Sequence, residues 1–80
     1  MKVRVERVHK NEIHIVTEFI KLEAFLKLAN AVGSGGMAKN VIQDGLVTVN
    51  GQTCTMRGKK LYDGDKVGFD GVTYFVRYAD

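Results

Sequence analysis

Residues 34–51 read SGGMAKNVIQDGLVTVNG, and this stretch decides the fold. Ser34 is a good helix N-cap, and apolar residues at helical spacing follow it: Met37, Ala38, Val41 and Ile42. Asp44-Gly45 ends this predicted helix. Leu46 to Val49 then predicts a strand, and Asn50-Gly51 is a strong hairpin signal because both residues tolerate positive φ. A helix that leads directly into a hairpin is therefore the centre of the fold.

Another helix is predicted before this one, within residues 17–31. Its apolar residues recur at helical spacing: Phe19, Leu22, Phe25, Leu26 and Ala29. Thr17 would cap an early start, a start near Lys21 would have a poor cap, and Gly33 suits the left-handed position after the helix. We expect core positions for Phe19, Phe25, Met37 and Ile42. Two helices joined by a short break form a compact helix-turn-helix unit.

Strands are predicted on both sides of the helices. Val3 to Val8 begins with alternating apolar and charged residues, His9-Lys10-Asn11 is a candidate turn, and Ile13 to Val16 is a candidate return strand. The C-terminal part predicts a meander of the strands 52–55, 66–69 and 72–78, with a basic loop at residues 57–61 and turns at 62–65 and at Asp70-Gly71. The fold class is α+β, with a two-helix helix-turn-helix-like unit packed on a small, mainly antiparallel β-sheet. We divide the chain into an N-terminal strand extension, residues 1–12, and one globular domain, residues 13–80.

Length and composition exclude several classes of protein. The chain has 80 residues, 45% apolar and 26% charged, which is ordinary for one small globular domain and excludes a two-domain enzyme. No apolar run reaches the roughly 18 residues that span a bilayer, and the stretch from Met1 to Arg4 is not followed by an apolar run of the length expected of a secretory signal. A single cysteine, Cys54, suits a reducing compartment. We therefore expect a cytoplasmic protein with no membrane partner.

The charges are distributed unevenly. The chain holds 12 Lys and Arg against 9 Asp and Glu, a modest excess that permits an anionic partner. Between Ala24 and Gln43 the only charged residues are Lys27 and Lys39, and between Leu46 and Tyr62 they are Arg57, Lys59 and Lys60. A helix N-terminus exposes unpaired N–H groups, and glycines there leave room for a phosphate. The middle of the chain is therefore locally positive, with a candidate anion site at the start of its second helix.

Five segments in this order resemble a known family: Leu22 to Leu28, Ser34 to Lys39, Asp44 to Gly51, Arg57 to Leu61, and Gly64 to Val67. Together they resemble the RNA-binding domain first known in small-subunit ribosomal protein S-four, above all the small stand-alone bacterial proteins of the YaaA/YbcJ type. The resemblance covers roughly residues 13 to 78. Two departures are the extension of residues 1–10 and Lys21, which stands where relatives often have a small hydroxyl cap.

The resemblance implies non-catalytic binding of structured RNA, with ribosomal RNA as the first candidate, by residues 13–80. The resemblance and the acid-poor middle of the chain together predict one phosphate-binding surface: Ser34, Gly35, Gly36, Lys39, Arg57, Lys59 and Lys60. No aromatic platform is evident on the polar positions, which favours shape recognition of a folded RNA over reading of single-stranded bases. Both parts of this surface also have a purely structural interpretation: residues 34–36 as a helix-joining turn and residues 57–60 as a solvated loop.

Other functions are weighed against this one. The main alternative is a protein-interaction module whose basic surface binds an acidic protein, and DNA is a weaker third candidate. A sulfur carrier would need a Gly-Gly tail, whereas this chain ends Tyr78-Ala79-Asp80. His9, His14 and Cys54 lie at no recognisable nucleophile or metal spacing. We therefore expect no enzyme, catalytic residue, metal, cofactor or small-molecule substrate. The sequence does not determine the oligomeric state, and a monomer is the first expectation.

Overall fold

The computed structural model describes residues 11–79, which form two helices and seven strands. Their order is β1 (Glu12–His14), β2 (Phe19–Lys21), α1 (Leu22–Leu28), α2 (Gly35–Gln43), β3 (Val47–Val49), β4 (Gln52–Thr53), β5 (Lys60–Tyr62), β6 (Lys66–Phe69) and β7 (Val72–Arg77). The α+β class is confirmed, with mainly antiparallel strand pairs. The strand predicted at Val3 to Val8 and the turn predicted at His9-Lys10 lie outside the described residues.

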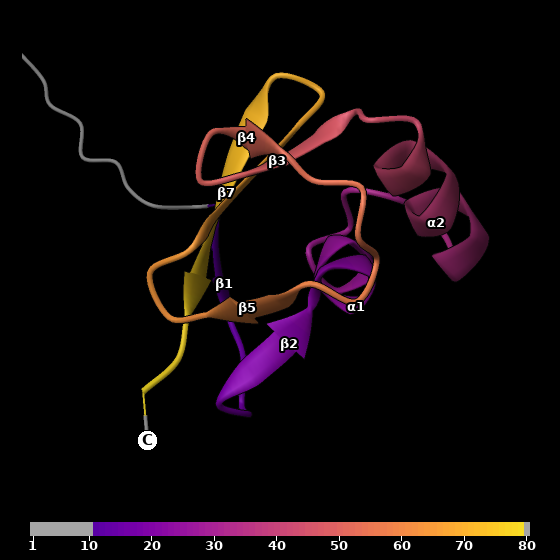
Figure 1. Cartoon of the computed structure of the whole chain (residues 1–80). Coiled ribbons are helices and arrows are strands. Elements are labelled where there is room, and N and C mark those ends of the chain that lie inside the picture. The colour runs from indigo at the N-terminus through magenta and orange to yellow at the C-terminus, as the bar shows by residue number, and fades with distance from the viewer. Residues whose placement is uncertain (1–10, 80) are drawn as a thin grey trace, which may run out of the picture.

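The larger sheet has five strands in the order β1-β7-β6-β3-β4. Strand β1 joins it in parallel to β7, with Glu12 opposite Phe75, and Ile15 N–H extends the pairing by donating to Arg77 O at 2.8 Å. The other pairs in this sheet are antiparallel. The strand expected around Ile13 is therefore present, and its described partner is the last strand of the chain (Figure 1).

Both predicted hairpins are confirmed. Asn50 and Gly51 have φ of 52° and 87°, and Asp70 and Gly71 have φ of 54° and 79°. Positive φ at both central residues defines the type I′ turn, whose twist matches that of the flanking strands. The turns set the registers β3–β4 and β6–β7, and strand alternation then directs one face of the sheet into the core.

The first helix is shorter than predicted, because part of it is a strand. Phe19, expected inside the helix, belongs to β2, which pairs antiparallel with β5 in a separate two-stranded sheet. Helix α1 begins only at Leu22, and its N-cap Lys21 makes no side-chain cap bond. The N–H groups of Leu22 and Glu23 donate instead to Lys59 O and Arg57 O, at 2.9 and 3.2 Å. Tertiary acceptors therefore replace the hydroxyl cap that the sequence lacks.

The link between the helices differs from the prediction in one residue and agrees in another. Asn30, with φ of 57°, takes the left-handed position after α1, so the assignment of that position to Gly33 is wrong. The helix ends earlier than expected, and a short asparagine side chain tolerates this conformation. Ser34 is confirmed as the N-cap of α2, since its Oγ accepts from Met37 N–H at 3.1 Å. Gly45, with φ of 77°, follows the C-cap of α2.

The core lies between the helices and the two sheets, with α1 between α2 and β2 (Figure 1). Its largest fully buried side chains are Phe25, Leu22, Leu26, Ile42, Leu61, Val47, Val67 and Val76. The core position predicted for Met37 is wrong, because α2 turns Ala38 and Ile42 inward and leaves Met37 51% exposed. The core position predicted for Phe19 is also wrong, because this residue is half-buried on β2 and is not among the residues packed against the core. Neither described helix has the length and apolarity of a membrane span.

Candidate nucleic-acid interface

Three elements enclose a hollow of about 460 Å³ on the helical side of the protein. Helix α1 contributes Glu23, Ala24 and Lys27, helix α2 contributes Gly35, Gly36 and Lys39, and the segment before β5 contributes Arg57. We call this the α1–α2 hollow. It brings together four of the seven residues predicted for the phosphate-binding surface, namely Gly35, Gly36, Lys39 and Arg57.

Arg57 reaches the hollow because its loop is fastened to the start of α1. The carbonyls of Arg57 and Lys59 accept the N–H groups of Glu23 and Leu22, and Lys59 N–H donates to Met56 O at 3.1 Å within the loop. The first turn of a helix has N–H groups without acceptors inside the helix, and here the carbonyl groups of the loop supply two of those acceptors. The bonds that begin the helix thus also position the arginine.

The glycines at the start of α2 leave the hollow open. A Cβ on Gly35 would lie 3.9 Å from Lys27 Cδ, and one on Gly36 would lie 4.0 Å from Ser34 Oγ, both ordinary contact distances. A methyl group would therefore fit, whereas a large side chain would occupy the space in front of the helix. Ser34 does not line the hollow, and its role in the structure is to cap α2, because its hydroxyl oxygen accepts from Met37 N–H. The α2 N-terminus is thus both capped and accessible.

The hollow carries a net positive charge. Lys27, Lys39 and Arg57 stand against a single carboxylate, Glu23, whose Oε1 lies 3.9 Å from Arg57 Nη1. Both partners of this ion pair are partly exposed, so water weakens their attraction. Lys27 was absent from the predicted surface, although it is one of only two charged residues between Ala24 and Gln43. Its place in the hollow depends on how α1 faces α2.

The other two predicted lysines, Lys59 and Lys60, do not line the hollow. Lys59 lines a smaller cavity of about 280 Å³ together with residues of the β3–β4 hairpin and the chain after it. Lys60 belongs to β5, where its Nζ lies 4.8 Å from the centre of the Phe19 ring. The segment predicted as one basic loop therefore divides into a loop, residues 57–59, and the first residue of a strand.

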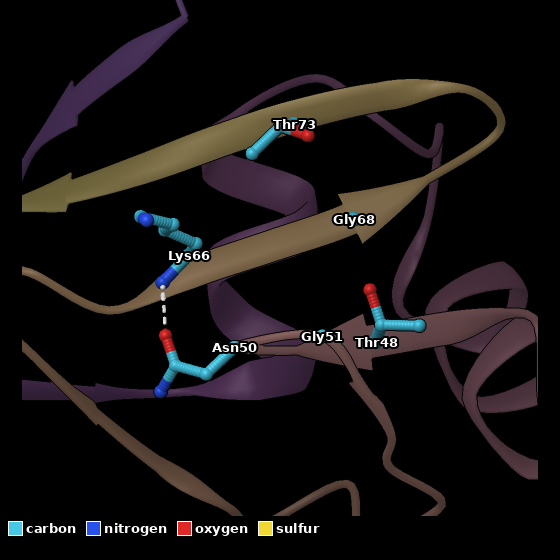
Figure 2. Close-up of a pocket in the computed structure, with 6 residues that line it drawn as sticks. All are labelled: Thr48, Asn50, Gly51, Lys66, Gly68 and Thr73. Carbon is cyan, nitrogen blue, oxygen red and sulfur yellow. Dashed lines mark hydrogen bonds between the residues drawn. The ribbon is translucent and has the colours of Figure 1, made fainter.

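A further cavity of about 400 Å³ lies on the other face of the larger sheet (Figure 2). Thr48, Gly68 and Thr73 are cross-strand neighbours there, and the missing side chain of Gly68 leaves the depression. Asn50 Oδ1 accepts from Lys66 N–H at 3.0 Å, so this polar group is already used within the fold. Lys66 is the one charged residue that lines this cavity. This cavity has one cation, whereas the α1–α2 hollow has three cations and one carboxylate, so the cavity is the weaker anion site.

Of the three reactive side chains considered in the sequence, His14 and Cys54 lie within residues 11–79, and His9 lies outside them. No cluster of three or more His, Cys, Asp or Glu suited to a metal ion occurs in the part of the chain that the structure describes. His14 lies on β1 with its Nε2 4.0 Å from Glu12 Oε1 and its side chain 77% exposed. Cys54 is half-buried, and its Sγ lies 3.8 Å from Met56 O.

Comparison with known protein families identifies the family of this chain. The family model described as "S4 domain" matches residues 13–77, and this chain belongs to the S4 domain family. It is the domain that the sequence motifs resemble. The resemblance inferred from those motifs is therefore confirmed.

Two of the proteins that this chain resembles are small and of similar length, and a third, which shares the fold, is a larger ribosomal protein. The "Probable ribosome maturation protein RlbA" of Bacillus subtilis is 48% identical over 65 residues, covering 81% of this chain and 92% of that protein. The solution structure of YbcJ of E. coli, described as revealing a motif involved in RNA binding, matches this chain with a TM-score of 0.70 at 26% identity. The match covers 96% of this chain and 99% of YbcJ. The 30S ribosomal protein S4e of Thermoplasma acidophilum shares the fold, with a TM-score of 0.61 at 24% identity over 80% of this chain and 34% of that one.

Proposed function

We propose that this protein binds structured RNA without catalysing a reaction, and that the α1–α2 hollow receives the phosphate backbone. The observation that carries the proposal is the convergence of Lys27, Lys39 and Arg57, from three separate elements, on a hollow bordered by the two glycines at the start of α2. Phosphate contacts supply much of the affinity of proteins for nucleic acids. Family membership and the RNA-binding description of YbcJ support the same assignment.

The backbone of α2 adds to the side-chain charges. Ser34 Oγ satisfies Met37 N–H, whereas the N–H groups of Gly35 and Gly36 have no acceptor within the described residues. Helix N-termini attract anions because unpaired N–H groups and the helix dipole both favour negative charge. A phosphate oxygen in the hollow would accept from these groups while the ammonium of Lys39 lies about one turn further along. The glycines allow that approach and the lysines and arginine strengthen it.

We further propose that the target is ribosomal RNA, which would place the protein in the cytoplasm. A relative named as a probable ribosome maturation protein and a structural neighbour from the small ribosomal subunit support this choice. Crosslinking in cells followed by sequencing of the bound RNA tests it. Enrichment of ribosomal RNA is expected. Recovery of acidic proteins without enriched RNA would instead favour the interaction module, and equal competition by duplex DNA would remove the preference for RNA.

The salt dependence of binding tests the position of the site. Each engaged cation contributes about 0.9 to the slope of log affinity against log salt on a duplex, so the three cations of the hollow should give a slope of about 2.7 in magnitude. Fluorescence anisotropy with a labelled RNA hairpin at several salt concentrations measures that slope. The Lys39→Ala variant should lower its magnitude by about 0.9 and weaken binding to every structured RNA.

Lys66→Ala provides the matched control, because it removes the same charge from the opposite face of the larger sheet. The control should leave the slope unchanged. An equal or greater loss of slope in Lys66→Ala would mean that the RNA lies on the sheet face of Figure 2, and the assignment of the hollow would be wrong.

A further inference from the structure

The two-stranded sheet β2–β5 carries two aromatic rings and two ammonium groups on its outer side. Phe19 is the cross-strand partner of Tyr62, and Lys21 is the partner of Lys60. Between these pairs, Leu61 is fully buried. Alternation along the strands therefore presents Phe19, Tyr62 and both lysines together, away from the core. The sequence predicted no aromatic platform, because it assigned Phe19 to a helix and Tyr62 to a turn, and the pairing of β2 with β5 corrects that expectation.

The tyrosine ring of this face is open and its backbone is held in place. Tyr62 is 46% exposed, and its ring centre lies 5.9 Å from that of Phe19 with the planes inclined by 47°. Lys60 Nζ lies over the Phe19 ring, so the more accessible aromatic surface belongs to Tyr62. Tyr62 N–H donates to Asp65 Oδ2 at 2.7 Å, and Thr17 Oγ1 donates to Phe19 O at 2.7 Å. A ring on a fixed backbone loses little freedom when a ligand stacks on it.

The two lysines of this face favour an anionic ligand. Like charges directly opposite each other on paired strands are destabilising, and Lys21 and Lys60 form such a pair. Within residues 11–79, neither ammonium group lies in an ion pair with a carboxylate. A phosphate between them would offset their repulsion.

The face is also continuous with the proposed phosphate site along the chain. Lys21 immediately precedes α1, whose residues Glu23 and Lys27 line the α1–α2 hollow. Arg57, which also lines that hollow, lies three residues before Lys60 and is fastened to the start of α1 through Glu23 N–H. An RNA backbone held in the hollow is thus close to the ammonium end of the β2–β5 sheet, with the aromatic pair one cross-strand position beyond Ile20 and Leu61.

We propose that the outer face of β2–β5 binds one unpaired nucleotide of the RNA, with its base stacked on Tyr62 and an adjacent phosphate between Lys21 and Lys60. The inference rests on the proposed RNA binding and deepens it, because it names the ligand as a duplex interrupted by, or ending in, an unpaired base. Aromatic side chains stack on any base through its π-face, and base edges need not be read. The preferred RNA is therefore defined by where a base is unpaired and much less by its sequence.

Two RNA hairpins with the same stem test this proposal. One stem is fully paired, and the other carries a single bulged 2-aminopurine, whose fluorescence falls when it stacks. The wild-type protein should bind the bulged hairpin more tightly and quench the 2-aminopurine. Tyr62→Leu, which keeps an apolar side chain and removes the ring, should weaken binding of the bulged hairpin by about 5- to 150-fold and leave the paired hairpin unaffected. Tyr62→Phe should retain both affinities.

The salt slope separates stacking from charge. Tyr62→Leu should leave the slope on the bulged hairpin unchanged, whereas Lys21→Ala should lower it by about 0.7 to 0.9. Absence of quenching by the wild-type protein, or equal affinity of Tyr62→Leu and wild type for the bulged RNA, would overturn the stacking site. If both hairpins still bind and Lys39→Ala weakens both, RNA binding at the hollow stands without the stacked base. If the wild type binds neither hairpin, both proposals fail.

Discussion

The helix-and-loop region, residues 19–43 and 57–61, differs in charge from the C-terminal meander, residues 62–79. The first region has one carboxylate, Glu23, and six cations: Lys21, Lys27, Lys39, Arg57, Lys59 and Lys60. The meander has two cations, Lys66 and Arg77, and three carboxylates: Asp63, Asp65 and Asp70. The two regions pack around one core, so the asymmetry is a property of the surface.

The regions also differ in what their polar side chains bind. In the meander, Asp65 accepts from Tyr62 N–H and Asn50 Nδ2, at 2.7 and 3.1 Å, and Asp63 accepts from Tyr78 N–H at 2.8 Å. In the helix-and-loop region, Arg57 is the one cation with a carboxylate within 4.0 Å among the described residues. Polar groups of the meander thus hold turns together, while most cations of the other region remain available to a ligand. Substitutions of polar residues should accordingly alter stability in one region and binding in the other.

Leu61 should be an exception to this division, and its substitution should have the largest effect on stability of the changes considered. It lies in the helix-and-loop region, yet it is fully buried and joins the β2–β5 sheet to the core. Leu61→Ala should lower the free energy of unfolding by about 2 to 5 kcal/mol through lost burial and a residual cavity. Urea denaturation measures the loss. Leu46→Ala, at a residue that is 57% exposed, should change it far less, and an equal loss in the two variants would contradict the core derived above.

Asp65 tests the structural role of the meander. Asp65→Ala removes the acceptor of Tyr62 N–H and of Asn50 Nδ2, and so loosens the turn that precedes β6. The free energy of unfolding should fall by about 1 to 3 kcal/mol, with the salt slope of RNA binding unchanged. Asp44→Ala is the control, since this carboxylate makes no side-chain hydrogen bond among the described contacts. A loss in Asp44→Ala as large as in Asp65→Ala would show that charge alone, and not the turn network, accounts for the effect.

The hairpins and α2 could be predicted because local chemistry decides them. Asn50-Gly51 and Asp70-Gly71 adopt left-handed φ in almost any hairpin, and Ser34 satisfies an N–H only three residues away. Strand β2 could not be predicted in this way. Phe19 continues the apolar spacing of α1, and its strand conformation depends on pairing with Tyr62, which lies far along the chain. Tertiary pairing therefore overrides helical periodicity at that position.

The candidate site shows the same division. Gly35, Gly36 and Lys39 were predictable as neighbours because they share the start of one helix. The presence of Lys27 and Arg57 beside them depends on how α1 packs on α2 and on backbone bonds from α1 to the loop. Periodicity places Lys27 off the apolar face and says nothing of what lies opposite. The RNA role of all these residues remains a prediction, whereas the arrangement of charges around the hollow is now defined.

Ser34 lies where the two functions of the helix-and-loop region meet, stability and binding. Ser34→Ala removes the acceptor of Met37 N–H and should lower the free energy of unfolding by about 0.5 to 2 kcal/mol. Ser34→Asp keeps a capping oxygen and adds a negative charge beside the α1–α2 hollow. It should therefore retain stability and weaken RNA binding, as urea denaturation and anisotropy will measure. Unchanged RNA affinity in Ser34→Asp would mean that the phosphate lies away from the start of α2.

Glu23 offers the smallest and most discriminating change, because it is the one carboxylate that lines the α1–α2 hollow. Glu23→Gln frees Arg57 from its ion pair and removes repulsion of a phosphate, so RNA affinity should rise by about 2- to 5-fold at low salt and less at high salt. The same change removes an acid from the first turn of α1 and should lower the free energy of unfolding by about 0.3 to 1 kcal/mol. Asp44→Asn alters the net charge equally at the opposite end of α2 and should leave the affinity nearly unchanged. Equal gains in the two variants would trace the effect to net charge, whereas a gain confined to Glu23→Gln would assign the phosphate to the hollow.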